Sequence, residues 1–162
     1  MPNQVIASES AASGPNQATQ VAIVVSEYNE HITSKLQKAA IETLVANNIN
    51  EQDIRIVRVP GAWELIYGTQ LVIGHKECCG VIALGAVIKG ETSHDQHINR
   101  AVSSGLMQLS ILHNKPVSFG LLTVNTLEQA IQRSGGNVGN KGEESAKALL
   151  ACLKLAKTLQ ND

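Results

Sequence analysis

Hydrophobic positions along the chain follow two alternating patterns. Four segments predict strands, and the third of them is almost uninterruptedly apolar, as in a strand buried on both faces of a parallel sheet. They are residues 20–26, 53–59, 80–88 and 116–123. After each of them apolar residues recur three or four positions apart, which predicts amphipathic helices. The order β-α-β-α-β-α-β-α-α predicts an α/β protein, a three-layer α/β/α sandwich around a mostly parallel four-stranded sheet with right-handed crossovers.

The helical segments have recognisable starts, stops and apolar faces. Asn29 is a candidate cap for the first helix, and Thr126 with Gln129 has capping-box spacing for a short helix ending at Gly135-Gly136. Residues 62–74, 94–113 and 140 onward predict the other helices, and 135–142 a glycine-rich loop. The side chains expected to face inward are Ile32, Leu36, Ala40, Leu44, Ile41, Val45, Leu65, Ile66, Leu71, Val72, Ile98, Val102, Leu106, Leu109, Leu112, Leu149, Leu150, Leu153 and Ala156.

Length and composition indicate one domain over residues 20–162, preceded by a polar arm at 1–19. With 13 basic and 14 acidic residues and no cationic cluster, we expect no nucleic-acid partner. No apolar run approaches ~18 residues, so we expect no membrane span. The first residues lack a basic start followed by an apolar core, so we expect no secretory signal. Cys78, Cys79 and Cys152 lack disulfide or zinc spacing, which favours packing roles, a reducing compartment and a cytoplasmic protein.

Polar chemistry follows the third predicted strand directly. Residues 89–95 read KGETSHD, which sets a cation, hydroxyls and an imidazole where strand gives way to helix. Ligands bind at this edge of open α/β sheets, and the next helix N-terminus attracts anions. Thr92 with Asp95, or Ser93 with Gln96, also has capping-box spacing, so these residues alternatively only start a helix.

The chain has only four aromatic residues, and two of them follow strands that should share an edge with this loop. Tyr28 comes just after the first strand and Trp63 just after the second, whereas Phe119 lies within the fourth. Two rings beside an anion-binding loop suit a flat heteroaromatic ligand with a phosphate or polyol partner. Each ring alone is equally compatible with packing: Tyr28 half-buried, Trp63 in the core of its helix, Phe119 as a strand side chain.

Several ionisable residues have a functional and an ordinary interpretation. His94 and His97 lie three apart near Asp95, but no third ligand is spaced for zinc, so a metal site is not expected. An imidazole is well suited to proton transfer near neutral pH. Arg133 would otherwise complement its helix dipole, Lys141 would be a solvated loop lysine, and Glu64 would pair with a surface cation or bind sugar-like hydroxyls.

Six segments resemble the lumazine synthase family of riboflavin biosynthesis, in the family's order and over nearly everything from Gln20 onward. They are SEYNEHITSKL at 26–36, VPGAWEL at 59–65, ALGAVIKGETSHD at 83–95, PVSFGLLT at 116–123, EQAIQRSG at 128–135 and GNKGEESA at 139–146. The resemblance implies a flavodoxin-like fold and a transferase that condenses 5-amino-6-(D-ribitylamino)uracil with 3,4-dihydroxy-2-butanone 4-phosphate. The product would be 6,7-dimethyl-8-ribityllumazine, with phosphate and water released and no metal or other cofactor.

The same resemblance implies roles for individual residues. Tyr28 would stack on the pyrimidine, and His94 would transfer protons. Phosphate would bind Glu91, Thr92 and Arg133. The pyrimidine and ribityl chain would contact Asn29, Gly61, Ala62, Trp63, Glu64, Val87, Ile88, Lys89, Gly90, Phe119 and Lys141. Phe119, Arg133 and Lys141 would come from the neighbouring subunit of a homopentamer.

Three positions depart from the usual family pattern: Lys89 where arginine is frequent, Asp95-Gln96-His97 after the histidine, and Tyr28 with its extra hydroxyl. Residues 135–142 lack the insertion that is typical of family members that form only pentamers. The resemblance therefore implies an icosahedral shell of twelve pentamers, with the free pentamer as the alternative. A non-catalytic flavin-binding or shell protein on this scaffold would lose the phosphate and proton-transfer residues. A flavodoxin-type electron carrier would need a hydroxyl-rich loop after the first strand.

Overall fold

A computed structural model describes residues 20–160, so the arm expected at 1–19 lies outside the described residues. Its centre is a four-stranded sheet in the order β2-β1-β3-β4. Every neighbouring pair is parallel. The strands are β1 (Gln20–Ser26), β2 (Ile54–Val59), β3 (Cys78–Ile88) and β4 (Val117–Val124). This sheet confirms the four strands that the apolar runs predict.

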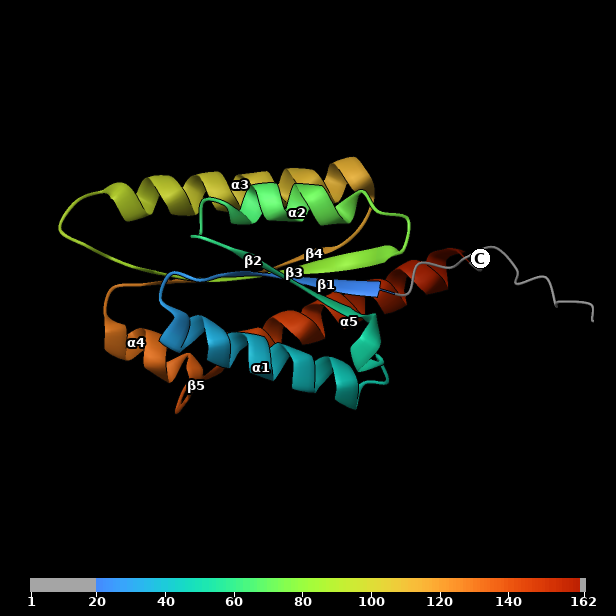
Figure 1. The fold of residues 1–162 in the computed structure, drawn as a ribbon, viewed down its shortest axis with the longest axis horizontal. Coiled ribbons are helices and arrows are strands. Elements are labelled where there is room, and N and C mark those ends of the chain that lie inside the picture. Colours follow the sequence, from blue (N-terminus) through green and yellow to red (C-terminus); the bar gives the residue numbers. More distant parts are fainter. Residues whose placement is uncertain (1–19, 161–162) are drawn as a thin grey trace, which may run out of the picture.

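Helices cover both faces of the sheet (Figure 1). On one face lie α2 (Leu65–Ile73) and α3 (His94–His113). On the other lie α1 (Glu30–Ala46), α4 (Leu127–Gln132) and α5 (Lys141–Gln160). The three layers confirm the predicted flavodoxin-like α/β/α sandwich. None of the helices within residues 20–160 is both long and apolar enough to cross a membrane.

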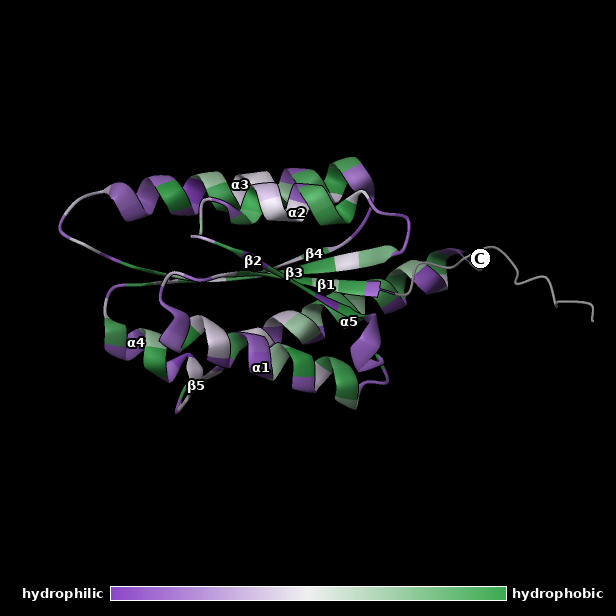
Figure 2. Ribbon diagram, viewed as in Figure 1, coloured by the Kyte–Doolittle hydropathy of each residue, from purple (hydrophilic) through white to green (hydrophobic). Residues whose placement is uncertain are grey.

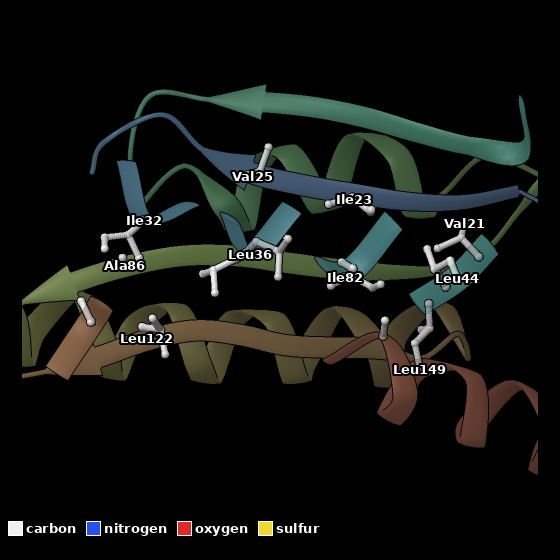
Figure 3. Close-up of a cluster of buried hydrophobic side chains, with 14 residues drawn as sticks. Val21, Ile23, Val25, Ile32, Leu36, Leu44, Ile82, Ala86, Leu122 and Leu149 are labelled. Carbon is white, nitrogen blue, oxygen red and sulfur yellow. The ribbon is translucent and has the colours of Figure 1, made fainter. Parts of the chain in front are cut away.

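The core consists of two clusters, one on each side of the sheet. On β1, Val21, Ile23 and Val25 pack toward α1 and α5, whereas Ala22 and Val24 pack with the α2 and α3 side chains. Figure 3 shows the first cluster, in which Leu36 and Leu149 meet strand side chains such as Ile82. Because both faces of β1 and β3 are covered, their sequences are continuously apolar rather than alternating.

The segment from 133 to 140 differs from the prediction. The short helix α4 ends at Gln132, and an antiparallel pair, β5 (Ser134–Gly136) and β6 (Gly139–Asn140), stands where a glycine-rich loop was expected. Gly135 and Gly139 have φ of 112° and 80°, which favour glycine and make this tight reversal possible. A 3-10 turn, Glu51–Asp53, likewise precedes β2.

The sequence shows capping-box spacing at the starts of both α4 and α3, but the two helix starts differ in the structure. Thr126 Oγ1 accepts from Gln129 N at 3.2 Å, and Gln129 Oε1 accepts from Asn125 N at 2.8 Å, so the predicted cap of α4 is confirmed. At α3 the cap residue Ser93 makes no side-chain cap bond. The reciprocal capping-box interpretation of residues 92–96 is therefore wrong, although Thr92 Oγ1 accepts a hydrogen bond from His94 N at 3.4 Å at the start of α3.

Most predicted inward positions are confirmed, but several side chains are exposed. Leu71 and Leu112 are 53% and 73% exposed, Val45 is 45% exposed, and Ala156 is also exposed. Cys152 is exposed as well, so its predicted packing role is wrong for the single chain. Figure 2 shows that α3 is hydrophilic at its beginning and more hydrophobic toward its end. One helix face contacts the sheet, and a second apolar stripe finds no partner within residues 20–160.

Candidate active site

A cavity of about 690 Å³ opens at the carboxyl ends of β1, β2 and β3, beside the start of α3. It is the place where ligands bind in open parallel sheets. Its walls come from four separate stretches of the chain. The lining residues are Tyr28, Asn29, Gly61, Ala62, Trp63, Glu64, Ala86, Val87, Ile88, Gly90, Thr92, His94, Asp95, His97 and Ile98. Most of the site positions expected from the ends of the first three strands are thus brought together, Lys89 and Glu91 excepted.

Backbone hydrogen bonds continue the β1–β2 pairing beyond the strands. Glu27 N donates to Val59 O at 2.8 Å, and Tyr28 N donates to Pro60 O at 3.0 Å. This pairing holds the Tyr28 segment beside the loop that bears Trp63. Tyr28 is 72% exposed, so its interpretation as a half-buried packing ring is wrong.

Asn29 occupies the cap position of α1 but does not cap it with its side chain. Its φ is 61°, in the left-handed region, and its side chain makes no cap bond. Instead Asn29 Nδ2 donates to Ala86 O on β3 at 2.9 Å. The residue therefore ties the end of β1 to the end of β3, and both contribute to the cavity wall.

The loop between β2 and α2 supplies the second ring. Leu65 N donates to Ala62 O at 3.2 Å, which closes a turn at this loop. Trp63 is 55% exposed, so its interpretation as a core residue of the helix is wrong. A Cβ at Gly61 would lie 3.1 Å from Glu64 Oε2, so the Glu64 carboxylate lies close over the glycine backbone.

The third wall is the end of β3 and the loop after it. Lys89 N donates to Val124 O at 2.8 Å, which extends the β3–β4 pairing by one residue. Gly90 has open space where a side chain would stand. Thr92 and His94 are exposed and line the cavity, whereas Lys89 and Glu91 are exposed but do not line it.

Ala86, Asp95, His97 and Ile98 also line the cavity and were missed as site residues. For His97 and Ile98 the signal was available in their spacing. Residues three and four apart on a helix share a face, so Ile98 and His97 belong with His94. Among residues 20–160, no cluster of three His, Cys, Asp or Glu side chains is arranged to hold a metal ion.

Phe119, Arg133 and Lys141 lie outside the cavity. Phe119 is on the edge strand β4 and is 38% exposed. Arg133 follows α4 and Lys141 begins α5, and both helices belong to the layer opposite α2 and α3 (Figure 1). Within a single chain these three residues therefore lie apart from the other site residues that the family resemblance implies.

Arg133 forms a fork with a carboxylate on α5. Its Nη1 and Nη2 donate to the two oxygens of Glu144 at 2.7 and 2.9 Å, and Nη1 also donates to Val138 O at 2.6 Å. Lys141 Nζ lies 3.6 Å from Glu144. The hydrogen bond from Arg133 lowers the pKa of Glu144, and the same bond raises the pKa of Arg133. Arg133 and Lys141 therefore share one carboxylate. Arg133 stands at the C-cap of α4, which remains compatible with its interpretation as a cation complementing the helix dipole, whereas Lys141 is partly buried at the start of α5, so its interpretation as a solvated loop lysine is wrong.

Comparison with known proteins agrees with the sequence motifs. The family model for 6,7-dimethyl-8-ribityllumazine synthase matches residues 18–157. The chain belongs to this family. A 6,7-dimethyl-8-ribityllumazine synthase from Rhodopirellula baltica is 52% identical over 136 residues, which cover 84% of this chain and 88% of the relative. As a member of the lumazine synthase family, the chain is an enzyme, a transferase of riboflavin biosynthesis that carries out the condensation giving 6,7-dimethyl-8-ribityllumazine.

Proposed function

We propose that the cavity at the carboxyl edge of the sheet is where this condensation takes place. The observation that supports it is the meeting of two exposed rings, Tyr28 and Trp63, with Thr92 and His94 around one hollow. A flat pyrimidine needs an aromatic face, and an anionic ketone phosphate needs hydrogen-bond donors near a helix start. Both needs are met within one cavity.

Each wall has a task in this proposal. Tyr28 stacks on the pyrimidine of 5-amino-6-(D-ribitylamino)uracil. Thr92, with Glu91 beside it, forms the turn that receives the phosphate, and His94 transfers protons. The ring and the ribityl chain are held by Asn29, Gly61, Ala62, Trp63, Glu64, Val87, Ile88, Lys89 and Gly90.

The remaining residues come from a second subunit. Phe119, Arg133 and Lys141 lie away from the cavity of their own chain, which supports a homopentamer with active sites between subunits. In that arrangement Phe119 covers the pyrimidine, Lys141 contacts its carbonyls, and Arg133 binds the phosphate. Glu144 keeps the Arg133 guanidinium in one orientation through its two hydrogen bonds.

The chemistry then follows from the placement of two reactants. The amine attacks the ketone carbon, and loss of water gives an imine while His94 relays protons. Phosphate departs as the enol forms, and the ribityl-bearing nitrogen then attacks the remaining carbonyl, so that ring closure releases a second water and gives the lumazine. Holding the reactants in the reactive geometry supplies up to about 7–11 kcal/mol. Proton transfer by His94 contributes the smaller part of the rate enhancement, about 100-fold or less, which is the low end for general acid-base catalysis.

The pentamer is proposed to assemble further into an icosahedral shell of twelve pentamers in the cytoplasm. The tight β5–β6 reversal, in which only Asn137 and Val138 connect Gly136 to Gly139, carries no inserted loop and supports the shell. Light scattering distinguishes the assemblies by mass: a particle of pentamer size refutes the shell, and a monomer refutes both. Leu112→Glu places a charge on a side chain that is 73% exposed in the chain, so it is expected to reduce particle mass without unfolding the chain.

The test of the site is lumazine formation followed by absorbance and confirmed by mass, with both substrates and with each alone. We expect product far above the slow spontaneous reaction, and a strong reduction in the variant Trp63→Ala. Product formation that is indifferent to Trp63 and Thr92 would place the reaction outside this cavity. Tight lumazine or riboflavin binding without turnover would instead favour a binding or shell module.

A further inference from the structure

Asp95 is a cavity residue that the family resemblance does not assign to the site. It lies in the first turn of α3, directly after His94, and lines the cavity. Its Oδ1 is shielded from solvent and accepts no hydrogen bond from the described residues. A buried carboxylate oxygen without a donor is costly, so such oxygens normally have a partner.

The neighbouring backbone does not supply that donor. Gln96 N and His97 N both donate to Ser93 O, at 3.1 and 3.4 Å. His94 N points to Thr92 Oγ1 at 3.4 Å. The positive end of α3 favours an acidic side chain such as Asp95 in its first turn. The carboxylate is thus held at the cavity wall with acceptor capacity that the chain itself does not use.

We propose that Asp95 binds the amine substrate by accepting a hydrogen bond from one of its N–H or ribityl O–H groups. This inference rests on the proposed function of the cavity. Rotation about the bond to a carboxyl group is soft, so a donor in the cavity can be met by either oxygen. The ketone phosphate is an unsuitable partner because its anionic group would be repelled by the carboxylate.

This assignment predicts opposite behaviour toward the two substrates. Asp95→Asn preserves the size of the side chain but removes its charge. Exchanging a charge-assisted for a neutral hydrogen bond is expected to raise the KM of the amine about tenfold. The KM of the ketone phosphate should stay the same or fall, because a nearby negative charge has been removed. A general loss of structure would raise both.

Binding can be measured without turnover. Trp63 is the only tryptophan of the chain and lines the cavity, so quenching of its fluorescence reports binding of the amine substrate alone. Asp95→Asn and Asp95→Ala are expected to weaken this binding about tenfold or more. Asn99→Ala is the matched control, because Asn99 Oδ1 is also buried without a partner one turn later but lies outside the cavity wall.

The result that overturns the inference is an amine affinity within twofold of the parent protein in both Asp95 variants. An equal loss in Asn99→Ala also overturns it, since the effect would then come from the buried helix face. Trp63→Ala, assayed by turnover, separates the two proposals. If Trp63→Ala raises the KM of the amine while the Asp95 variants do not, the cavity is the site and only the proposed role of Asp95 is refuted. If neither Trp63→Ala nor the Asp95 variants raise it, the proposed site is refuted as well.

Discussion

Asn29 links the fold to the proposed site, and its replacement tests that link. The β1–β3 pairing ends at Val25 and Leu84, and the Asn29 side chain adds one more bond, to Ala86 O at 2.9 Å. Its φ of 61° is a conformation in which asparagine is tolerated and alanine is strained. Asn29→Ala therefore removes a hydrogen bond and introduces backbone strain at once.

The two contributions can be separated with matched variants. Asn29→Gly removes the hydrogen bond but keeps the backbone relaxed, and should lower the free energy of unfolding by about 1 kcal/mol. Asn48 has a similar φ of 66°, is exposed and has no hydrogen bond from its side chain, so Asn48→Ala measures the strain alone, about 1–2 kcal/mol. Asn29→Ala should cost the sum, about 2–3 kcal/mol.

Thermal unfolding at equal protomer concentration is the appropriate assay, since oligomerisation shifts apparent stability. For a chain of this length, about 2–3 kcal/mol corresponds to a fall in Tm of roughly 4–12 °C. Lumazine formation by Asn29→Gly should also decrease, because the wall formed by β1 and β3 is no longer tied together. The reasoning is refuted if Asn29→Ala costs no more than Asn48→Ala, or if Asn29→Gly is neutral for both stability and turnover.

Three further predictions test packing, electrostatics and catalysis. Gly142→Ala would bring a Cβ to 1.9 Å from Leu36 O and should destabilise by about 3 kcal/mol or more, whereas Gly90→Ala meets nothing and should leave Tm unchanged. Because Arg133 lowers the pKa of Glu144, their pair stabilises the fold fully above pH ~4.5, the ordinary glutamate value, and this contribution is lost as pH falls through the lowered pKa. Glu144→Gln should therefore reduce the free energy of unfolding by under ~1 kcal/mol near neutral pH, and its Tm should approach that of the parent protein in acid below that lowered pKa. Arg133→Ala should reduce kcat/KM more than His94→Ala, and steady-state kinetics with the opposite ranking would contradict the proposed mechanism.

The sequence predicts the sheet well because both faces of its central strands are covered. A strand such as β3, with burial along nearly its whole length, has no polar positions that a helix or loop would require. The position of Tyr28, Trp63 and His94 follows from the same fact. Each comes just after one of three neighbouring parallel strands, so all three reach one edge.

Hydrophobic periodicity could not predict the shortest elements. The β5–β6 pair has strands of three and two residues, too short to show a period, and its two glycines with positive φ are equally typical of a loop. The sequence places Asp95 at a helix start, near two histidines, and among the departures from the family pattern, but does not assign it to the cavity. Its contribution to the cavity depends on how α3 is set against β3, a tertiary relation that sequence spacing does not contain.

The errors at Leu71 and Leu112 have a physical cause that bears on the proposed assembly. Helical periodicity indicates which residues are apolar together but not which surface they meet. On α3, Val102 and Leu106 pack in the core cluster with strand side chains and Leu109 is also buried, while Met107, Ile111 and Leu112 are 58–74% exposed. Large exposed apolar stripes of this kind are typical of surfaces that contact another protein. A site that lacks Phe119, Arg133 and Lys141 in its own chain and a helix with a second apolar stripe therefore favour the same conclusion, that the working unit contains more than one copy of the chain.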